Sequence, residues 1–145
     1  MDPTGAMSPV GEEEVRARLA ADAASRHMGV EITSIGDGCI TLRLPPQPWM
    51  INGHGILHGG AMFWLGDTAF AFLSESRGRP AVTRQAGITY IAPLTVGDQL
   101  YATAREKARY GRNSIVDVDL LDADDALIAT MTVHGTDLRE RPPQV

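Results

Sequence analysis

Residues 52–76 read Asn-Gly-His-Gly-Ile-Leu-His-Gly-Gly-Ala-Met-Phe-Trp-Leu-Gly-Asp-Thr-Ala-Phe-Ala-Phe-Leu-Ser-Glu-Ser. A loop rich in glycine and histidine leads directly into an apolar run, in which Asp67 and Thr68 carry the only strongly polar side chains between Ala61 and Leu73. The run predicts one helix of about 18 residues, or roughly 27 Å at the standard rise. A helix that is apolar on almost every face is expected to be wrapped by the rest of the protein. A carboxylate within such a helix is unfavourable unless it is hydrogen-bonded, paired or used in chemistry.

The overall composition is that of an ordinary globular protein. The chain has 145 residues, a hydrophobic fraction of 43% and a mean hydropathy of -0.10. Its net charge of -5 argues against a broad nucleic-acid surface. The apolar run is too short for a membrane span, and with Cys39 as the single cysteine a reducing compartment is the default. We therefore expect a cytoplasmic protein that binds neither nucleic acid nor a membrane.

A chain of this length is sufficient for one domain with a sizeable core. We expect residues 11–138 to form that single domain. Residues 1–10 lack hydrophobic periodicity and are expected to be a disordered tail or a cloning remnant, and residues 139–145 are expected to fray.

The segments that flank the central helix have the periodicities of one further helix and six strands. Apolar residues every four positions predict a helix over 11–26, with a stripe of Val15, Leu19 and Ala23. Alternation predicts a β-hairpin of residues 28–35 and 40–44, and four later strands near 82–92, 99–110, 114–121 and 126–137. Short turns between these strands indicate an antiparallel sheet that is solvated on one face. One long helix against such a sheet is an α+β architecture.

Alternation also assigns the inward-facing side of the three last strands. The residues expected to face the core are Leu100, Ala102, Ala104, Ala108, Val116, Val118, Leu120, Leu127, Ala129, Met131 and Val133. Four aromatic residues of the loop and helix are expected to lie in the core or in an interface: Trp49, Phe63, Trp64 and Phe70.

The segment from Asn52 to Gly60, followed by Asp67 in the helix, resembles the PaaI-type acyl-CoA thioesterases of phenylacetate catabolism. Ile88-Thr-Tyr-Ile-Ala-Pro93 and the pair Gly111-Arg112 resemble later segments of that family, so that the similarity covers about residues 11–137. The resemblance implies a hotdog fold, in which an antiparallel sheet curls around one long central helix. It also implies a homodimer, further paired into a tetramer, with each active site built between two subunits. It implies no cofactor, because coenzyme A is part of the substrate.

The resemblance assigns roles to five residues. Asp67 matches the catalytic carboxylate, which acts either as a general base or as a nucleophile. Gly60 matches the residue whose backbone N–H points at the thioester carbonyl. Asn52 and His58 match polar groups that orient the substrate or a water, and Thr83 stands where some relatives have a serine that helps to place the water.

Elementary geometry supports part of this assignment. The first turn of a helix has free N–H groups and a positive potential, and Gly59 and Gly60 have no side chain that would keep a carbonyl oxygen away from them. Asp67 follows Gly60 by seven residues, about two turns, which places both on one face of the helix roughly 10 Å apart. A carboxylate and an oxyanion donor therefore lie on the same side of one helix.

Other residues near these motifs permit two readings. His58 could only cap the helix, and His54 is either a loop residue or part of the substrate-binding loop. Arg112, after Gly111, could bind a phosphate of coenzyme A or lie solvated in a turn. The histidines lack acids or thiols at the spacing of a metal site, so we expect no metal.

Three functions are compatible with the sequence. The first is an acyl-CoA thioesterase that uses Asp67 and the Gly60 amide. Because the loop and helix offer aromatic and Met side chains but no charge for an acyl tail, we expect aryl or arylacetyl thioesters, such as phenylacetyl-CoA or hydroxyphenylacetyl-CoA. The alternatives are a hydroxyacyl-thioester dehydratase using His58 and Asp67, and an acyl-CoA binding module without catalytic activity.

Overall fold

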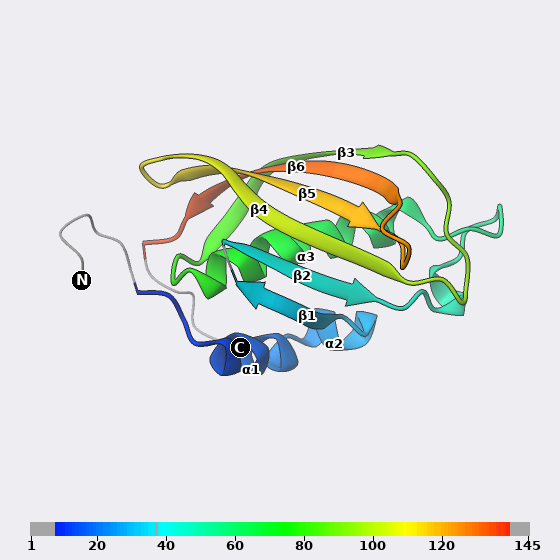
Figure 1. Cartoon of the computed structure of the whole chain (residues 1–145), viewed down its shortest axis with the longest axis horizontal. Coiled ribbons are helices and arrows are strands. Elements are labelled where there is room, and N and C mark those ends of the chain that lie inside the picture. The colour runs from blue at the N-terminus through cyan, green and yellow to red at the C-terminus, as the bar shows by residue number, and fades with distance from the viewer. Residues whose placement is uncertain (1–7, 37, 140–145) are drawn as a thin grey trace.

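The computed structural model describes residues 8–36 and 38–139 (Figure 1). The expectations for residues 1–7, for Asp37 in the hairpin turn and for residues 140–145 lie outside this described part. The elements, in chain order, are α1 (Glu12–Ala21), α2 (Ala23–Met28), β1 (Glu31–Gly36), β2 (Cys39–Leu44), the 3-10 turn η1 (Pro48–Met50), α3 (Gly59–Ser76), β3 (Ala81–Tyr90), β4 (Leu100–Tyr110), β5 (Asn113–Leu121) and β6 (Leu127–Asp137).

The strands form one six-stranded sheet in the order β1-β2-β4-β5-β6-β3. Every neighbouring pair is antiparallel, and the sheet curls along α3, while α1 and α2 lie beside β1 (Figure 1). This is the predicted α+β architecture. The expectation that all later strands are joined to their neighbours by short turns is wrong for β3, because residues 91–99 cross from β3 to β4 and leave β3 paired with β6 at the edge of the sheet.

The central helix has the predicted length of 18 residues. Most of it is buried against the concave face of the sheet, and Phe70 lies in the core as expected. The expectation that α3 is covered on every side is wrong within one chain, because Phe63 and Trp64 are each 36% exposed and Trp49 is 57% exposed. Gly60, Phe63, Trp64 and Asp67 recur at helical spacing and form a stripe that the sheet does not cover. We call these four residues the open stripe.

The first predicted helix is two helices. The chain leaves the helical conformation at Asp22, whose φ of -76° and ψ of 110° are extended, and the Asp22 side chain accepts the Ser25 N–H as the N-cap of α2. An aspartate favours this cap because its oxygen satisfies an otherwise free N–H. The break changes the phase of the apolar stripe, so that Val15 and Leu19 are buried, Ala23 is exposed and Met28 is buried in its place.

The predicted inward positions are confirmed with two exceptions. Ala108 is exposed because the register of β4 against β5 shifts between Glu106 and Ala108, and this bulge reverses the alternation after it. Leu127 is 41% exposed because a shift between Leu120 and Leu121 turns Ile128 inward instead. None of the helices in the described ranges is long and apolar enough to cross a membrane.

The contact between α3 and β6 predicts a test of core packing. A Cβ atom on Gly135 would lie 2.2 Å from the Phe70 Cζ, so Gly135→Ala must displace a buried ring and should lower the free energy of unfolding by about 1–3 kcal/mol. Gly87→Ala on β3 is the matched control, since nothing lies within 4 Å of its added Cβ. Urea unfolding of both variants at one protein concentration measures the difference, and equal stabilities would contradict this packing.

Candidate active site

The Asn52 side chain organises the loop that precedes α3. Its Oδ1 accepts the His54 N–H at 2.9 Å and the Ile56 N–H at 3.4 Å. The Asn52 N–H donates to the Ile56 carbonyl at 2.8 Å, which closes the loop. The His54 side chain is exposed. The amide oxygen of Asn52 is therefore used within the loop, whereas its Nδ2 has no acceptor among the described residues and can serve a ligand.

His58 caps the N-terminus of α3, one of the two roles left open by the sequence. Its Nδ1 accepts the Gly60 N–H at 2.8 Å. An accepting Nδ1 carries no proton, so the proton of this neutral imidazole is on Nε2. The Gly59 N–H, in contrast, donates to no acceptor in residues 8–36 or 38–139. The free amide at the helix start is thus that of Gly59.

Tyr90 is a residue of this site that the sequence analysis did not single out. Its hydroxyl donates to the Gly59 carbonyl at 2.9 Å, and a Cβ on Gly59 would lie 2.8 Å from the tyrosine Cζ and Oη. A side chain at position 59 would therefore have to displace the Tyr90 ring from this contact. The sequence placed Tyr90 in a strand but gave no signal that the end of this strand contacts the start of the helix.

Asp67 and Thr83 are brought together as the family roles require. The Thr83 Oγ1 donates to the Asp67 Oδ1 at 2.6 Å. Asp67 is partly buried, and Thr83 is exposed at the beginning of the edge strand. Asp67 shares the open stripe of α3 with Gly60, as the spacing predicted. The threonine fixes one carboxylate oxygen and leaves the other for a further partner.

The predicted site residues form two separate groups within one chain. Asp67 and Thr83 make one group, and Asn52, His58 and Tyr90 surround the start of α3. Asp67 lies eight residues after Gly59, about 12 Å along the helix axis. No hydrogen bond or ion pair among the described residues links the two groups.

Two cavities flank the start of α3. One, of about 470 Å³, lies beside Gly59 and is lined by Asn52, Ile56, Leu57, Met62, Tyr90, Ile91, Ala92 and Pro93. We call it the Gly59 cavity. The other, of about 340 Å³, lies beside Gly60 and is lined by Met28, Trp49, Met50, Ile51, His58, Ala61 and Trp64. Both walls are mainly apolar, as is common for small-molecule sites.

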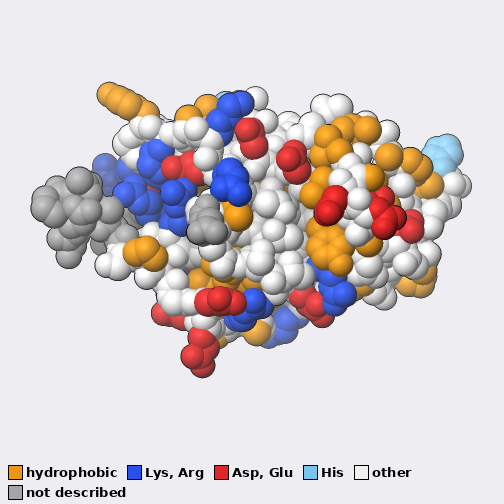
Figure 2. All heavy atoms as spheres, viewed as in Figure 1, with side chains coloured by type: hydrophobic (Ala, Val, Ile, Leu, Met, Phe, Trp, Pro, Cys, Tyr) orange, Lys and Arg blue, Asp and Glu red, His pale blue; other side chains and the backbone are white. Residues whose placement is uncertain are grey.

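The opposite end of the molecule is rich in arginine. Figure 2 shows Lys and Arg side chains gathered at the left of the view, over the region where α3 ends and β4 turns into β5. The carboxylates of Glu106 and Asp137 pair with three arginines there, Arg77, Arg79 and Arg109. Arginine is therefore in excess over carboxylate in this region.

Gly111 and Arg112, predicted to bind substrate, form the turn between β4 and β5 at this arginine-rich end. Gly111 has a φ of 58°, which favours glycine, and Arg112 Nη1 donates only to the Asp137 carbonyl, at 3.4 Å. Burial acts to lower the pKa of Arg109, but hydrogen bonds to Glu106 and Asp137 outweigh it and raise that pKa above its usual value. Arg109 is thus fixed in its pairs, whereas the Arg112 guanidinium forms no ion pair with the described residues.

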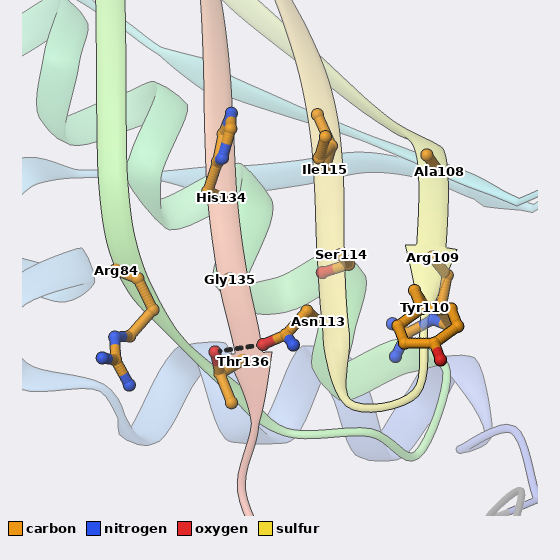
Figure 3. Close-up of a pocket in the computed structure, with 10 residues that line it drawn as sticks. All are labelled: Arg84, Ala108, Arg109, Tyr110, Asn113, Ser114, Ile115, His134, Gly135 and Thr136. Atoms are coloured by element: carbon orange, nitrogen blue, oxygen red, sulfur yellow. Dashed lines mark hydrogen bonds between the residues drawn. The ribbon is translucent and has the colours of Figure 1, made fainter.

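A hollow of about 360 Å³ lies next to this turn, on the face of the sheet away from α3 (Figure 3). Arg84 on β3 stands at one side, and Arg109 and Tyr110 on β4 stand at the other. Between them the Thr136 hydroxyl donates to the Asn113 Oδ1 at 2.9 Å. Arg84 forms no ion pair within the described ranges, so its charge is available to an anion.

The described residues contain no group of side chains suited to hold a metal ion. In residues 8–36 and 38–139, no three His, Cys, Asp or Glu side chains lie close enough together to hold a metal ion.

Comparison with known proteins identifies the family. The family model of the thioesterase superfamily matches residues 54–129, more than half of the chain, from His54 of the loop through α3, β3, β4 and β5 to the first residues of β6. This chain belongs to the thioesterase superfamily. The predictions of a thioester hydrolase and of a hotdog fold are thereby confirmed.

Individual relatives of this thioesterase agree with the family. It is 30% identical to the acyl-coenzyme A thioesterase PaaI of Escherichia coli over 123 residues. These residues make up 85% of this chain and 88% of the E. coli protein. The structure of the E. coli protein from the phenylacetic acid degradation operon superposes with a TM-score of 0.82, at 28% identity over 87% of this chain and 91% of that one. Human acyl-coenzyme A thioesterase 13 is 29% identical over 74% of this chain and 79% of its own. The predicted resemblance to PaaI is confirmed.

The cap formed by His58 predicts a difference between two substitutions. His58→Ala removes the acceptor of the Gly60 N–H and should lower the free energy of unfolding by about 1 kcal/mol. His58→Asn retains an N-cap acceptor and should lose much less. His54→Ala, which removes an exposed side chain from the same loop, is the control for thermal and urea unfolding. The cap is contradicted if the Asn variant is as unstable as the Ala variant.

Proposed function

We propose that this thioesterase hydrolyses acyl-CoA thioesters with Asp67 as general base and a backbone N–H at the start of α3 as oxyanion donor. The observation that carries the proposal is the hydrogen bond of 2.6 Å from Thr83 to Asp67 on the open stripe. It orients a carboxylate toward the side of the helix that the sheet leaves uncovered. A carboxylate in such a position can accept a proton from water at the moment of attack.

The proposed reaction has two steps. The free oxygen of Asp67 takes a proton from water while the water oxygen bonds to the thioester carbon, and the carbonyl oxygen becomes an oxyanion. The carbonyl bond then re-forms, the carbon–sulfur bond breaks, and the proton is returned to the departing coenzyme A sulfur. An attack by Asp67 itself, with an anhydride intermediate, is the alternative that the sequence left open. We favour the base, because Thr83 fixes the carboxylate and can also help to hold a water.

The oxyanion donor is best supplied by Gly59. The sequence assigned this role to Gly60, but the Gly60 N–H is bonded to His58 Nδ1 in this chain. The Gly59 N–H has no partner in the described residues and lies at the positive end of α3. Gly60 could donate only after the His58 ring had moved. Preorganised donors of this kind contribute about 2.7–4 kcal/mol each to transition-state stabilisation.

A complete site needs two chains. β3 is an edge strand, and a row of unpaired backbone groups at an edge favours pairing with another strand. Thr83 and Tyr90 lie near opposite ends of β3, so antiparallel pairing of two β3 strands about a two-fold axis would set Thr83 beside the partner's Tyr90. Asp67 would thereby approach the partner's Gly59, and the apolar open stripe would be covered. We propose this homodimer as the active form, with a tetramer built from two dimers.

The coenzyme A part and the acyl part of the substrate then each have a site that suits their chemistry. The arginine-rich end suits the phosphates of coenzyme A, with Arg84 and Arg112 among the arginines that form no ion pair with a described carboxylate. The apolar Gly59 cavity suits the acyl group. Two relatives support this substrate class. The E. coli relative is an acyl-coenzyme A thioesterase. A Streptococcus mutans relative was solved bound to acetyl CoA, and it superposes with a TM-score of 0.73 at 26% identity over 78% of this chain and 91% of that one.

We propose that the acyl group is an aryl or arylacetyl group and that the enzyme acts in phenylacetate catabolism. The Gly59 cavity offers Met62, Tyr90 and Pro93 but no charged side chain. Its volume of about 470 Å³ accommodates a phenyl ring with room to spare. The E. coli relative is described as a protein of the phenylacetic acid degradation operon, which is consistent with such a substrate.

Thiol release from a panel of acyl-CoAs tests the function. We expect phenylacetyl-CoA or hydroxyphenylacetyl-CoA to be hydrolysed faster than palmitoyl-CoA, because Tyr90 and Met62 in the wall of the Gly59 cavity suit contact with an aromatic ring. Faster release from palmitoyl-CoA would contradict the aryl substrate. Loss of water from 3-hydroxyacyl-CoA without thiol release would indicate the dehydratase, and binding without either reaction would indicate a binding module.

Replacing Asp67 by Asn tests the base. The variant keeps the shape but cannot accept the proton, so kcat should fall by at least roughly a hundredfold while acyl-CoA binding persists. Asp119→Asn is the matched control, because Asp119 accepts a threonine hydroxyl, that of Thr130, on the outer face of the sheet at 3.3 Å. Near-normal turnover of Asp67→Asn in an intact assembly would require another base.

A single turnover in ¹⁸O water with enzyme in excess tests for attack by Asp67 itself. Label in the aspartate would indicate an anhydride opened at the aspartyl carbon. Label in the released acid alone is the result expected for direct attack by water, and an anhydride opened at the acyl carbon gives that same result.

A further inference from the structure

We propose that Tyr90 is a positioning residue for the oxyanion donor, a role that rests on the proposed thioesterase mechanism. Tyr90 is the last residue of β3, and its hydroxyl donates to the Gly59 carbonyl at 2.9 Å. Its ring atoms would lie 2.8–3.0 Å from a Cβ on Gly59. The ring therefore lies directly against the first residue of α3, and the hydroxyl fixes the orientation of that residue.

The backbone around Tyr90 is anchored to the sheet. The N–H groups of Ile91 and Ala92 both donate to the Ile128 carbonyl, at 2.9 and 3.1 Å. Ile128 is buried at the beginning of β6. Tyr90 is thus a rigid link between the sheet and the start of α3.

Gly59 differs from its neighbours in that its N–H has no acceptor among the described residues. The His58 N–H donates to the Met50 carbonyl at 2.8 Å, and the Gly60 N–H donates to the His58 ring at 2.8 Å. The Gly59 N–H must remain unpartnered to serve a substrate. A glycine followed by another glycine is also the most flexible start a helix can have. The Tyr90 hydroxyl restrains this residue from its carbonyl side and leaves its N–H free.

Packing alone does not account for Tyr90. Within one chain Tyr90 is 51% exposed beside the Gly59 cavity, so burial of the ring contributes little to the core of that chain. Its hydroxyl makes one hydrogen bond to a described residue, and that residue is the proposed oxyanion donor. Small displacements of such a donor weaken the transition state more than the bound substrate. Loss of the hydroxyl should therefore lower kcat more than it raises KM.

Tyr90→Phe keeps the ring and removes only the hydroxyl. We expect kcat for the best acyl-CoA to fall by about tenfold, with KM and the inhibition constant of free coenzyme A within about threefold of wild type. The thermal midpoint should stay within about 2 °C, since one half-exposed hydrogen bond is lost. Tyr101→Phe, which removes a hydroxyl from β4 outside the site, is the control and should keep wild-type kinetics.

The possible outcomes distinguish a failure of the Tyr90 proposal from a failure of the proposed thioesterase function. A kcat of Tyr90→Phe within about twofold of an active wild type would overturn the role of Tyr90 alone. A rise in KM with unchanged kcat would also overturn it, because Tyr90 would then bind the acyl group instead of positioning Gly59. A wild-type protein that releases no thiol from any acyl-CoA would show that the proposed function itself fails.

Discussion

The start of α3 has to satisfy two opposing physical demands. Helix α3 is the core around which the sheet curls, so its apolar side chains must be buried. Its first N–H group, that of Gly59, must remain free of protein acceptors if it is to stabilise an oxyanion. The structure meets both demands by fixing every neighbouring group: His58 caps Gly60, Tyr90 holds the Gly59 carbonyl, and the Asn52 loop closes on itself. Glycine at positions 59 and 60 is compatible with these contacts, because a Cβ at either position would displace the Tyr90 or His58 ring.

The same helix is one reason for our proposal that the active site needs two chains. The open stripe leaves Phe63 and Trp64 exposed next to Asp67, and the edge strand β3 leaves backbone groups unpaired beside Thr83. Exposed aromatic residues next to an unprotected strand edge are typical of an interface. We therefore propose that catalysis and assembly are coupled, because the carboxylate of one chain and the helix start of another would meet only when both apolar surfaces are covered.

Much of the fold followed from the sequence, because hydrophobic periodicity reports which face of an element is buried. The length of α3, the pairing of β1 with β2 and most inward strand positions were predicted on this basis. The break at Asp22 and the bulges near Ala108 and Leu127 were missed, because a cap and a register shift depend on neighbours that alternation does not encode. In the site, Asp67 and Thr83 were each predicted as site residues, but the hydrogen bond between them was not. The contact of Tyr90 with Gly59 and the engagement of Gly60 by His58 needed tertiary structure, since both depend on how a strand end and a ring meet the helix start.

The central claim is that Asp67 of one chain acts in one site with Gly59 of the other chain and the loop that Asn52 orders before it, and complementation tests it directly. Asp67→Asn and Asn52→Ala are each expected to be nearly inactive. When the two variants are unfolded together and refolded in equal amounts, about half of the dimers should be mixed, each with one intact site, so that about a quarter of wild-type thiol release returns. Wild-type protein treated in the same way gives the reference. If the mixture stays at the average of the two variants although mixed dimers form, both residues act within one chain and the account is contradicted.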